Sequence, residues 1–594
     1  TSLRWVRPLQ GIVALFGEEI VALEVAGVHS GAATVGHRFH HSRAITIGSA
    51  NDYAGKLHAC HVLIDPAERE AIIRDGAAAA AAAAGLTLVR DDALVTENAG
   101  LTEWPVALLG GFDPSFLEVP REVIQLTMRT NQKYFACTDS AGAFAPNFVC
   151  VANIEAADGG AAIVAGNQKV LAARLSDAKF FWEQDLKVPL EEQAKKLGQI
   201  VFHERIGTLD QKVRRVCQIA KSLVSEGIIV GTDVETVDRA GRLAKADLVT
   251  GMVGEFPELQ GVIGSYIARA QGEPAEIADA IRDHYKPTGP DDDVPTAPVT
   301  VALGVAERLY TLASFFGIDE GPTGSKDPFA LRRAALGLLA LITENGLRLP
   351  IARMLFIEMH LDFVIDAINA KERAEIERAR LLKKLSPFVN GPQLLNDFLK
   401  LEHDRTFVTG VTPQVKERSK QLERVLAFLA DRLKVQQREA GVRHDLIDAV
   451  FSLGGEDDLV RLLARVKALQ SFVETREGAD LLTGYRRAAN ILRKEAWAGE
   501  GKEAEPPSYP PAPEEAALIA ALDAAEPKAR GAIADEDFEG AMAALATLRA
   551  PVDAFFDKVT VNDPDPVKRA TRLTLLARLR DAVHRVADFS RIEG

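Results

Sequence analysis

The chain has 594 residues, of which 47% are hydrophobic and 26% are charged, and its formal net charge at pH 7 is −14. This length and composition predict several globular domains, about three to five, and exclude an intrinsically disordered chain. The negative net charge argues against a protein that coats long nucleic acids, DNA included, through bulk charge. RNA binding through local basic faces stays open.

Two features indicate the compartment. No apolar run long enough to cross a bilayer, about 18 residues, is free of charged side chains. The four cysteines (Cys60, Cys137, Cys150 and Cys217) have no paired spacing, which fits a reducing environment. We therefore expect a cytoplasmic protein with no membrane partner. Residues 1–5 show neither an initiator Met nor a signal peptide, so we expect a longer natural chain.

Strand-like and helical signals alternate over residues 1–185. Short apolar runs at 11–16 and 20–25 flank a Gly-Glu-Glu turn and predict a hairpin. Residues 146–153 predict a buried strand, and the alanine-rich run 77–84 predicts a surface helix. This mixture predicts an α+β domain.

From residue 186 onward the hydrophobic periodicity is helical almost throughout. A regular apolar stripe is formed by Leu209, Val213, Val216 and Ile219. The proline-rich stretches 287–298 and 499–513 interrupt the pattern and predict loops. The second stretch is either a domain linker or a long loop within one domain. The sequence thus predicts a multidomain, mainly α protein with an α+β N-terminal domain.

No catalytic site is apparent in the sequence. The His-x-Gly-His motif and lysine-rich loop of a Rossmann-class synthetase are absent. Residues 321–327 lack the spacing of a phosphate-binding loop, so we expect a turn there, with Asp327 as the N-cap and Pro328 as the first residue of a helix. The histidines and cysteine within 58–61 are too crowded to face one metal ion from a regular element. We expect no catalytic residue and no metal site.

Seven strings of residues carry a resemblance to a known family. The first reads Thr-Met-Arg-Thr-Asn-Gln-Lys-Tyr-Phe, and the set lies at residues 127–135, 151–155, 166–178, 246–264, 326–335, 487–492 and 555–559. In this order, and over essentially the whole chain, they resemble the beta subunit of the bacterial-type, heterotetrameric glycyl-tRNA synthetase. One string alone is weak evidence for this family, whereas seven strings in the same order identify it specifically.

The resemblance implies a partner and a division of labour. Two alpha and two beta chains would assemble, with the alpha chain activating glycine with ATP and Mg²⁺ and the beta chain binding tRNA(Gly). No cofactor is expected on this chain. The implied domains are a B3/B4-like domain at 1–185, a degenerate HD-like helical domain at 186–320, a helical body at 321–458 and a helical anticodon-binding domain at 459–594.

The HD-like region can be examined residue by residue. A working HD hydrolase holds its metal with a His, a His-Asp pair and a distant Asp. Here Ala246 and Asp247 stand at the pair and Glu307 at the distant position. The resemblance therefore implies a fold reused as scaffold, with Asp247 as a structural acceptor. The alternatives are a metal-dependent HD-type phosphohydrolase and an RNA chaperone without a partner chain.

Basic residues in the last domain are the candidates for tRNA contact. Arg486, Asn490 and Lys494 are spaced by four, which places them on one helical face beside Arg487. Such a face suits phosphates and unstacked bases, although most such patches are merely solvated. Further candidates border the turn 562–566 or lie on the solvent side of a helix predicted at 567–589; they are Lys558, Lys568, Arg578 and Arg585. Arg572 lies within the apolar stripe of that helix and predicts a buried salt bridge.

A second group of cations predicts contact with tRNA or with the alpha chain. Arg129, Lys133 and Arg174 lie in the family strings, and the alternative for the first two is a polar turn between strands. We expect Tyr134 and Phe135 to lie in the hydrophobic core rather than on a surface that stacks with bases. Arg332 and Arg333 point about 100° apart on a helix, so at most one is expected to be buried.

Overall fold

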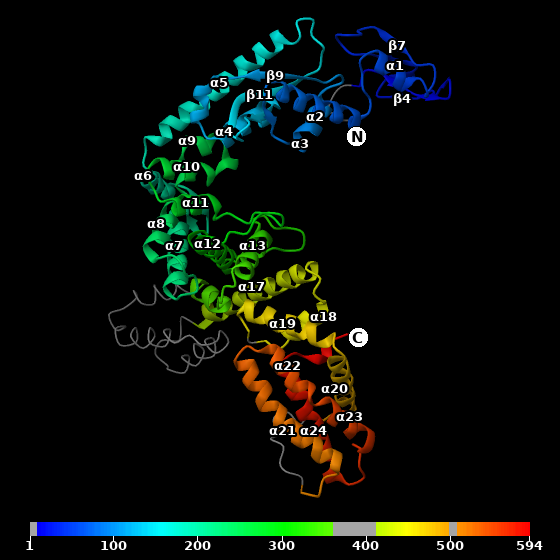
Figure 1. The fold of residues 1–594 in the computed structure, drawn as a ribbon, viewed down its shortest axis with the longest axis vertical. Helices are drawn as coiled ribbons and strands as arrows, with labels where there is room; N and C mark the ends of the chain where they lie inside the picture. Colours follow the sequence, from blue (N-terminus) through cyan, green and yellow to red (C-terminus); the bar gives the residue numbers. More distant parts are fainter. Residues whose placement is uncertain (1–8, 360–411, 455, 498–507, 594) are drawn as a thin grey trace. The chain divides into compact units, whose positions relative to one another are not determined.

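The computed structural model describes residues 9–359, 412–454, 456–497 and 508–593 (Figure 1). The chain folds as two compact units, Thr1–Gln193 with Asp247–Gly272, and Ala194–Ala246 with Glu273–Gly594. Among the described residues, all strands precede residue 209 and helices dominate from there to the C-terminus. The predicted class, mainly α with an α+β N-terminal region, is confirmed.

The first unit begins with a module of short strands. Its elements are β1 (Ile12–Val13), β2 (Leu15–Phe16), β3 (Glu19–Ile20), β4 (Glu24–Val25), β5 (Val28–Gly31), β6 (Ala33–Val35), β7 (Ala44–Thr46) and α1 (Tyr53–Ala59). Strand β2 pairs antiparallel with β3, with Leu15 opposite Ile20, so the hairpin predicted here is confirmed. The small core of the module contains Ile45, Ile47 and Leu57.

A four-stranded antiparallel sheet comes next, in the order β8-β10-β11-β9. Its strands are β8 (Thr87–Leu88), β9 (Val106–Gly111), β10 (Phe135–Thr138) and β11 (Phe144–Ala152). The strand predicted at 146–153 is therefore confirmed. Tyr134 is buried, as predicted, and its ring stacks on Phe148 with 4.7 Å between the centroids.

Helix α2 (Pro66–Ala83) packs on this sheet, and α3 (Asp92–Leu101) packs on α2. The alanine-rich run forms a surface helix, as predicted, with Ala78, Ala79, Ala82 and Ala83 exposed on its outer face. Ala77 and Ala81 are fully buried in the core between α2 and the sheet. Methyl side chains let a helix approach its neighbours closely, so the run serves packing.

The first unit is completed by α4 (Arg121–Thr127), a π-helical turn (Met128–Gln132), α5 (Ala161–Leu186), α9 (Gly251–Glu255) and α10 (Val262–Ala270).

Two hydrogen bonds between residues far apart in the sequence join α5 to α9. The carboxylate of Asp185, near the end of α5, accepts hydrogen bonds from the backbone N–H groups of Gly251 and Met252 at 2.9 and 2.8 Å. An anion at a helix N-terminus satisfies donors that lack an intrahelical partner.

The second unit is built around a buried helix. Its first helices are α7 (Leu209–Ser225), α8 (Val234–Leu243), α11 (Ala275–Asp283), α12 (Pro298–Gly317) and α13 (Leu331–Glu344). The predicted stripe on α7 is confirmed, since Val213, Val216 and Ile219 are buried. Among the described residues, one helix, α12, is long enough and apolar enough to cross a membrane. However, 83% of its apolar window is buried inside the protein, as expected for a core helix.

The start predicted for α13 is wrong. Ala330 adopts a left-handed conformation with φ 53°, so the helix begins only at Leu331 and Pro328 lies outside it. Asp327 still caps the helix, because its carboxylate accepts hydrogen bonds from the N–H groups of Leu331 and Arg332 at 2.8 and 2.9 Å. The N-cap position itself is occupied by Ala330, so Asp327 satisfies the first N–H groups of the helix from three residues further upstream.

Helices side by side form the C-terminal part of this unit (Figure 1). They are α17 (Thr412–Glu439), α18 (His444–Phe451), α19 (Leu459–Val473), α20 (Arg476–Lys494), α21 (Pro513–Ala534), α22 (Phe538–Ala546), α23 (Arg549–Lys558) and α24 (Pro566–His584). The last helix is shorter than predicted and ends at His584, followed by a 3-10 turn (Phe589–Arg591). Most of the predicted loop 499–513 lies outside the described residues.

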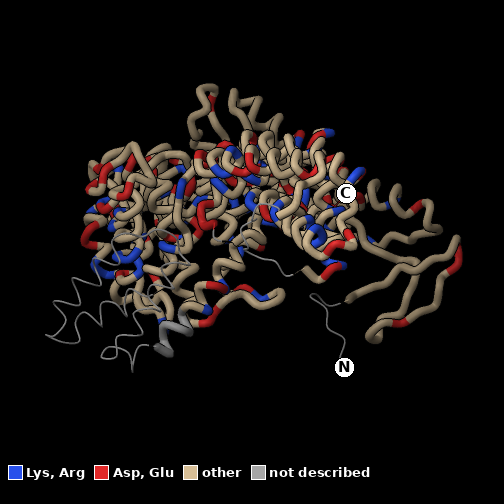
Figure 2. The backbone as a smooth tube through the Cα atoms, turned by 90° about the horizontal axis from the view of Figure 1, so that it is seen from below, with Lys and Arg blue, Asp and Glu red and all other residues tan. Residues whose placement is uncertain are grey.

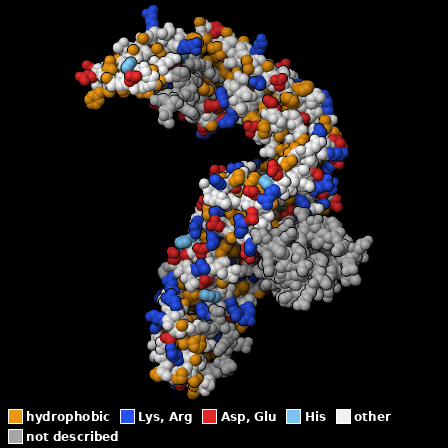
Figure 3. Space-filling model, turned by 180° about the vertical axis from the view of Figure 1, so that it is seen from behind, with side chains coloured by type: hydrophobic (Ala, Val, Ile, Leu, Met, Phe, Trp, Pro, Cys, Tyr) orange, Lys and Arg blue, Asp and Glu red, His pale blue; other side chains and the backbone are white. Residues whose placement is uncertain are grey.

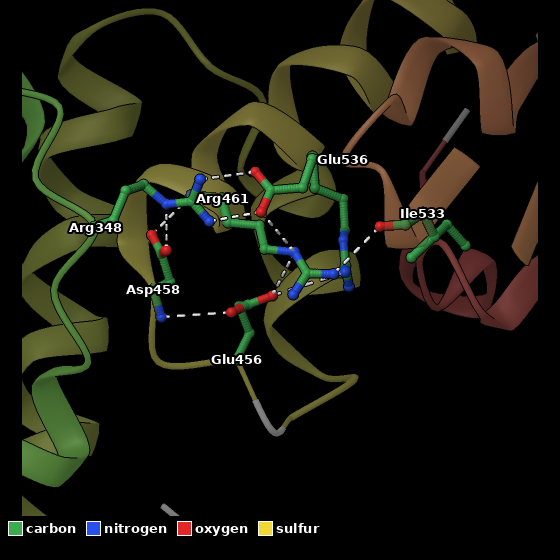
Figure 4. A network of polar contacts seen from close by, with 7 residues as sticks. Arg348, Glu456, Asp458, Arg461, Ile533 and Glu536 are labelled. Carbon is green, nitrogen blue, oxygen red and sulfur yellow. Dashed lines mark hydrogen bonds and ion pairs between the residues drawn. The ribbon is translucent and has the colours of Figure 1, made fainter. Parts of the chain in front are cut away.

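An ion-pair network joins the segment after α13 to two of these helices (Figure 4). The guanidinium of Arg348 donates to the Glu536 carboxylate at 2.9 and 2.6 Å and also contacts Asp458, the N-cap of α19. Arg461 on α19 donates to the carbonyl of Ile533 at 3.3 Å. The network anchors the α21–α22 turn, so the C-terminal helices are tied to the rest of their unit.

Candidate nucleic-acid interface

Helix α20 contains all the residues of the basic face predicted from the sequence, but only some of them are exposed. Thr475 begins the helix by accepting a hydrogen bond from Gly478 N at 3.0 Å. Ala488 and Leu492 bury the opposite side. Asn490 and Lys494 are exposed, and cations in the last turn are favoured by the negative end of the helix dipole.

Arg486 does not belong to the exposed face. It is half-buried, and its Nη2 donates to the carbonyl oxygen of Ile592 at 2.7 Å. The segment after α24 therefore covers this position, which the spacing along α20 does not reveal. Arg493 takes its place, since it is exposed and donates to Asn490 Oδ1 at 2.6 Å. We define the α20 face as Arg487, Asn490, Arg493 and Lys494.

Arg487 links the α20 face to an open pocket. Its guanidinium carbon lies 4.5 Å from the Phe556 ring centroid, and its Nη2 donates to the Phe556 carbonyl at 3.2 Å. The pocket has a volume of about 390 Å³ and lies between α20 and the end of α23. It is lined by Arg487, Ile491, Phe556, Asp557, Lys558, Val559, Thr560, Val561 and Asn562. Apolar side chains next to cations and amides suit a planar base.

The two lysines bordering the turn 562–566 have partners. Lys558 is 67% exposed and pairs with Glu514 at 3.0 Å. Lys568 is half-buried, with its Nζ 5.8 Å from the centroid of the Tyr509 ring. Lys494, by contrast, makes no ion pair within the described part of the chain. The α20 face is therefore more strongly positive than the turn.

On α24 one prediction is confirmed and one is wrong. Arg572 is buried and pairs with Glu515 at 3.2 Å and with Asp563 at 2.7 Å, as predicted. Arg578, predicted to face solvent, is only 22% exposed. The reason is that two acidic residues of α21, Asp523 and Glu526, each pair with it at 2.7 Å.

Arg585, just after α24, is exposed and has no ion pair among the described residues. Of the two α24 candidates, it is the one whose charge is available to a ligand.

The candidate cations of the N-terminal domain differ in whether an acidic side chain neutralises them. Arg129 donates to Asp91 at 2.6 Å, and Lys133, which has a left-handed backbone with φ 60°, pairs with Glu97 at 2.6 Å. These carboxylates neutralise most of the positive field. Arg174 on α5 is exposed and, among the described residues, has no such partner.

The two arginines of α13 also differ, as their 100° separation predicts. Arg332 is 30% exposed, lies 3.9 Å from Asp327 and donates to the carbonyl of Gly324. Arg333 is exposed and forms no ion pair within the described residues. Arg333 is therefore the member of the pair available to a partner.

Glu307 lies in a buried ion cluster. Its carboxylate is 2.6 Å from Lys212 Nζ and 3.5 Å from Lys245 Nζ, and the two lysine side chains are 8% and 7% exposed. Burial acts to raise the pKa of Glu307, but the two ammonium groups outweigh it and hold the pKa below its usual range. Burial, aided by Lys245, lowers the pKa of His284 to about 3, so this imidazole is neutral.

Asp247 has a different set of partners. Its Oδ2 accepts hydrogen bonds from the N–H groups of Gly261 and Gly264, at 2.5 and 3.1 Å. The side chain is fully buried and stands at the N-terminus of α10. Its predicted role as a structural acceptor is confirmed.

Comparison with known proteins identifies the family. Residues 1–452 match a family model described as the glycyl-tRNA synthetase beta subunit, and residues 481–589 match the DALR anticodon binding domain. The whole chain aligns, at 48% identity, with 80% of a protein of Rhodospirillum centenum named glycine–tRNA ligase beta subunit. Proteins of the same name from Phenylobacterium zucineum and Paracoccus denitrificans are 46% and 43% identical and are each covered over 79% of their length.

The chain belongs to the glycyl-tRNA synthetase beta subunit family. Within this family member, the DALR match begins in α20 and reaches the 3-10 turn after α24. It therefore includes the α20 face and the pocket beside it.

Three contributors to this interface escape prediction from the sequence. Arg493 is spaced by three from Asn490, a neighbour relation on a helix that would have found it. Helical spacing turns Ile491 away from the basic face, and Phe556 belongs to an apolar string typical of a core. Both line the pocket, although Phe556 is only 8% exposed. Nothing in the local pattern shows that α20 and α23 meet.

Proposed function

We propose that this chain binds tRNA(Gly) and positions it for glycylation by a separate catalytic alpha chain, which uses ATP and Mg²⁺. The assembly would contain two alpha and two beta chains and act in the cytoplasm. The observation that carries the proposal is the α20 face beside an open, partly apolar pocket, inside the segment that matches an anticodon binding domain. Binding energy used to orient tRNA lowers the barrier without any general base on this chain.

The chemistry of the α20 face suits an anticodon loop. Arg487, Arg493 and Lys494 supply charges for backbone phosphates. An unstacked base entering the pocket would meet Ile491 as an apolar surface and the side chain of Asn562 as a hydrogen-bonding group at the rim.

Three exposed arginines extend the proposal beyond this face. Outside the α20 face, Arg174, Arg333 and Arg585 are the exposed arginine candidates without an ion pair among the described residues. We assign them to tRNA or alpha-chain contact. Arg129, Lys133, Arg332 and Arg578 are largely neutralised by neighbouring acids and contribute less.

We also propose the finer domain assignments that the family resemblance implies. Residues 1–185 would form a B3/B4-like domain and residues 186–320 an HD-like fold reused as scaffold. The Glu307 cluster supports a scaffold over a phosphohydrolase. Two ammonium groups within 3.5 Å of a carboxylate repel a divalent cation at the place where the distant ligand of an HD site would stand.

Binding of tRNA(Gly) to the purified chain at several salt concentrations tests the proposal. The three cations of the α20 face predict that the logarithm of the affinity falls with the logarithm of salt with a slope of about −2 to −3. Absence of binding, or binding insensitive to salt, would contradict the proposal. Stoichiometric divalent metal together with phosphatase turnover would favour the phosphohydrolase instead.

A further inference from the structure

The β2–β3 hairpin in the N-terminal module leaves its apolar side chains in solvent. Phe16 is 82% exposed and Ile20 is 53% exposed, and the next residues along the chain continue the pattern, with Val21 at 43% and Leu23 at 40%. We define these four residues as the hairpin patch. Single exposed apolar residues are ordinary on protein surfaces, whereas four within eight positions of one hairpin are not.

Only one face of this hairpin packs on the module, because Leu15 contacts the core of Ile45, Ile47 and Leu57, and the face that carries Phe16 is open within the described residues. Strands β2 and β3 form a sheet of their own, with Phe16 opposite Glu19 and Leu15 opposite Ile20. Directly paired residues share a face, so Phe16 and Ile20 project from opposite faces. An isolated two-stranded hairpin is only marginally stable in water. A ribbon that exposes one face fully at Phe16 and the rim of the other at Ile20 is suited to contact with a groove of another molecule.

The negative charge around the patch limits which class of molecule can bind there. Residues 8–37 contain no Lys or Arg but contain Glu18, Glu19 and Glu24, all exposed. Figure 2 shows acidic positions and few basic ones on the tubes at this end of the chain, and in Figure 3 hydrophobic side chains project beside acidic ones at the end of the module. Carboxylates repel phosphates, so RNA does not fit this surface.

We propose that the hairpin patch is a docking surface for the catalytic alpha chain, which would present an apolar groove bordered by basic side chains. The inference rests on the proposed function for the existence of that partner. Apolar anchors rimmed by complementary charge are the usual composition of a specific protein interface. The alpha chain would then bind the acidic hairpin, and tRNA would bind the basic α20 face, so each partner has its own surface on this chain.

The test compares a double variant with a single variant, with all three substitutions at exposed apolar positions. Phe16→Ser with Ile20→Asp removes both anchors, while Val230→Asp changes a side chain that is 75% exposed in the other unit. Exposed positions tolerate polar residues, so neither variant is expected to lose its fold. Binding of the alpha chain by the full chain is measured by calorimetric titration, and binding of tRNA(Gly) by the full chain alone is measured in parallel.

We expect the double variant to lose about thirtyfold or more in affinity for the alpha chain, and Val230→Asp to retain it. Affinity of the double variant for tRNA(Gly) should stay unchanged. Alpha-chain affinity within about twofold of the unmodified chain would overturn the inference. Loss of tRNA affinity instead would assign the patch to RNA.

The two proposals fail in distinguishable ways. An unmodified chain that binds the alpha chain through the patch but does not bind tRNA(Gly) contradicts the proposed function and leaves the docking surface standing. If the unmodified chain binds tRNA(Gly) with the predicted salt dependence, and the double variant binds the alpha chain with unchanged affinity, only the docking surface is contradicted.

Discussion

Replacing Glu307 by Ala is expected to destabilise the helical unit by about 3–5 kcal/mol, because the change leaves two buried ammonium groups without their common partner. Urea unfolding, followed by hydrogen exchange in α7 and α12, measures the effect. Arg424→Ala is the matched control in the same unit, since it removes an ion pair with Asp319 in which both side chains are half-exposed. Exposed pairs contribute about 0–1 kcal/mol.

The dependence on pH gives this prediction a second readout. A carboxyl group whose pKa is lowered on folding stabilises the protein above its unfolded pKa, and that contribution is lost as pH falls. The difference between the unmodified chain and Glu307→Ala should therefore shrink on acidification below about pH 4.5. Equal stability of the two proteins at neutral pH would show that the cluster is solvated and not buried.

Replacing Arg487, Arg493 and Lys494 together by Ala should weaken tRNA(Gly) binding about a hundredfold at low salt and reduce the magnitude of the salt slope by about two to three. The physical reason is the loss of the three charges that the α20 face offers to phosphates. Arg486 is left out because its bond to the Ile592 carbonyl is structural. Filter binding over a salt series measures both quantities.

The control for this variant removes an equal charge elsewhere. Arg90, Arg214 and Arg476 have side chains that are 84%, 74% and 83% exposed, and Arg476 lies at the opposite end of α20. Their joint replacement by Ala should change affinity only through net charge. If both triple variants bind tRNA(Gly) alike, the α20 face makes no specific contribution.

Local patterns predicted the elements more reliably than their ends. The β2–β3 hairpin and the buried stripe of α7 depend on residues close in sequence, and both are confirmed. The burial of Arg572 followed from its place inside an apolar stripe. The start of α13 was wrong because a left-handed Ala330 is not a conformation that its side chain favours, so the sequence gives no sign of it.

The errors at the candidate site have a common physical origin in contacts between distant residues. Arg578 is neutralised by acidic residues 52 and 55 positions earlier, and Arg486 is held by a carbonyl 106 positions later. The pocket beside Arg487 exists only because α20 and the end of α23 meet. Helical spacing shows which side chains share a face, but not what covers that face.

Aminoacylation of tRNA(Gly) by the alpha chain, with and without this chain, distinguishes a subunit that positions tRNA from one that activates the amino acid. We expect robust, glycine- and ATP-dependent charging only when both chains are present, and no glycyl-adenylate from this chain alone. Full charging by the alpha chain in isolation, or adenylate synthesis by this chain in isolation, would contradict the proposed function.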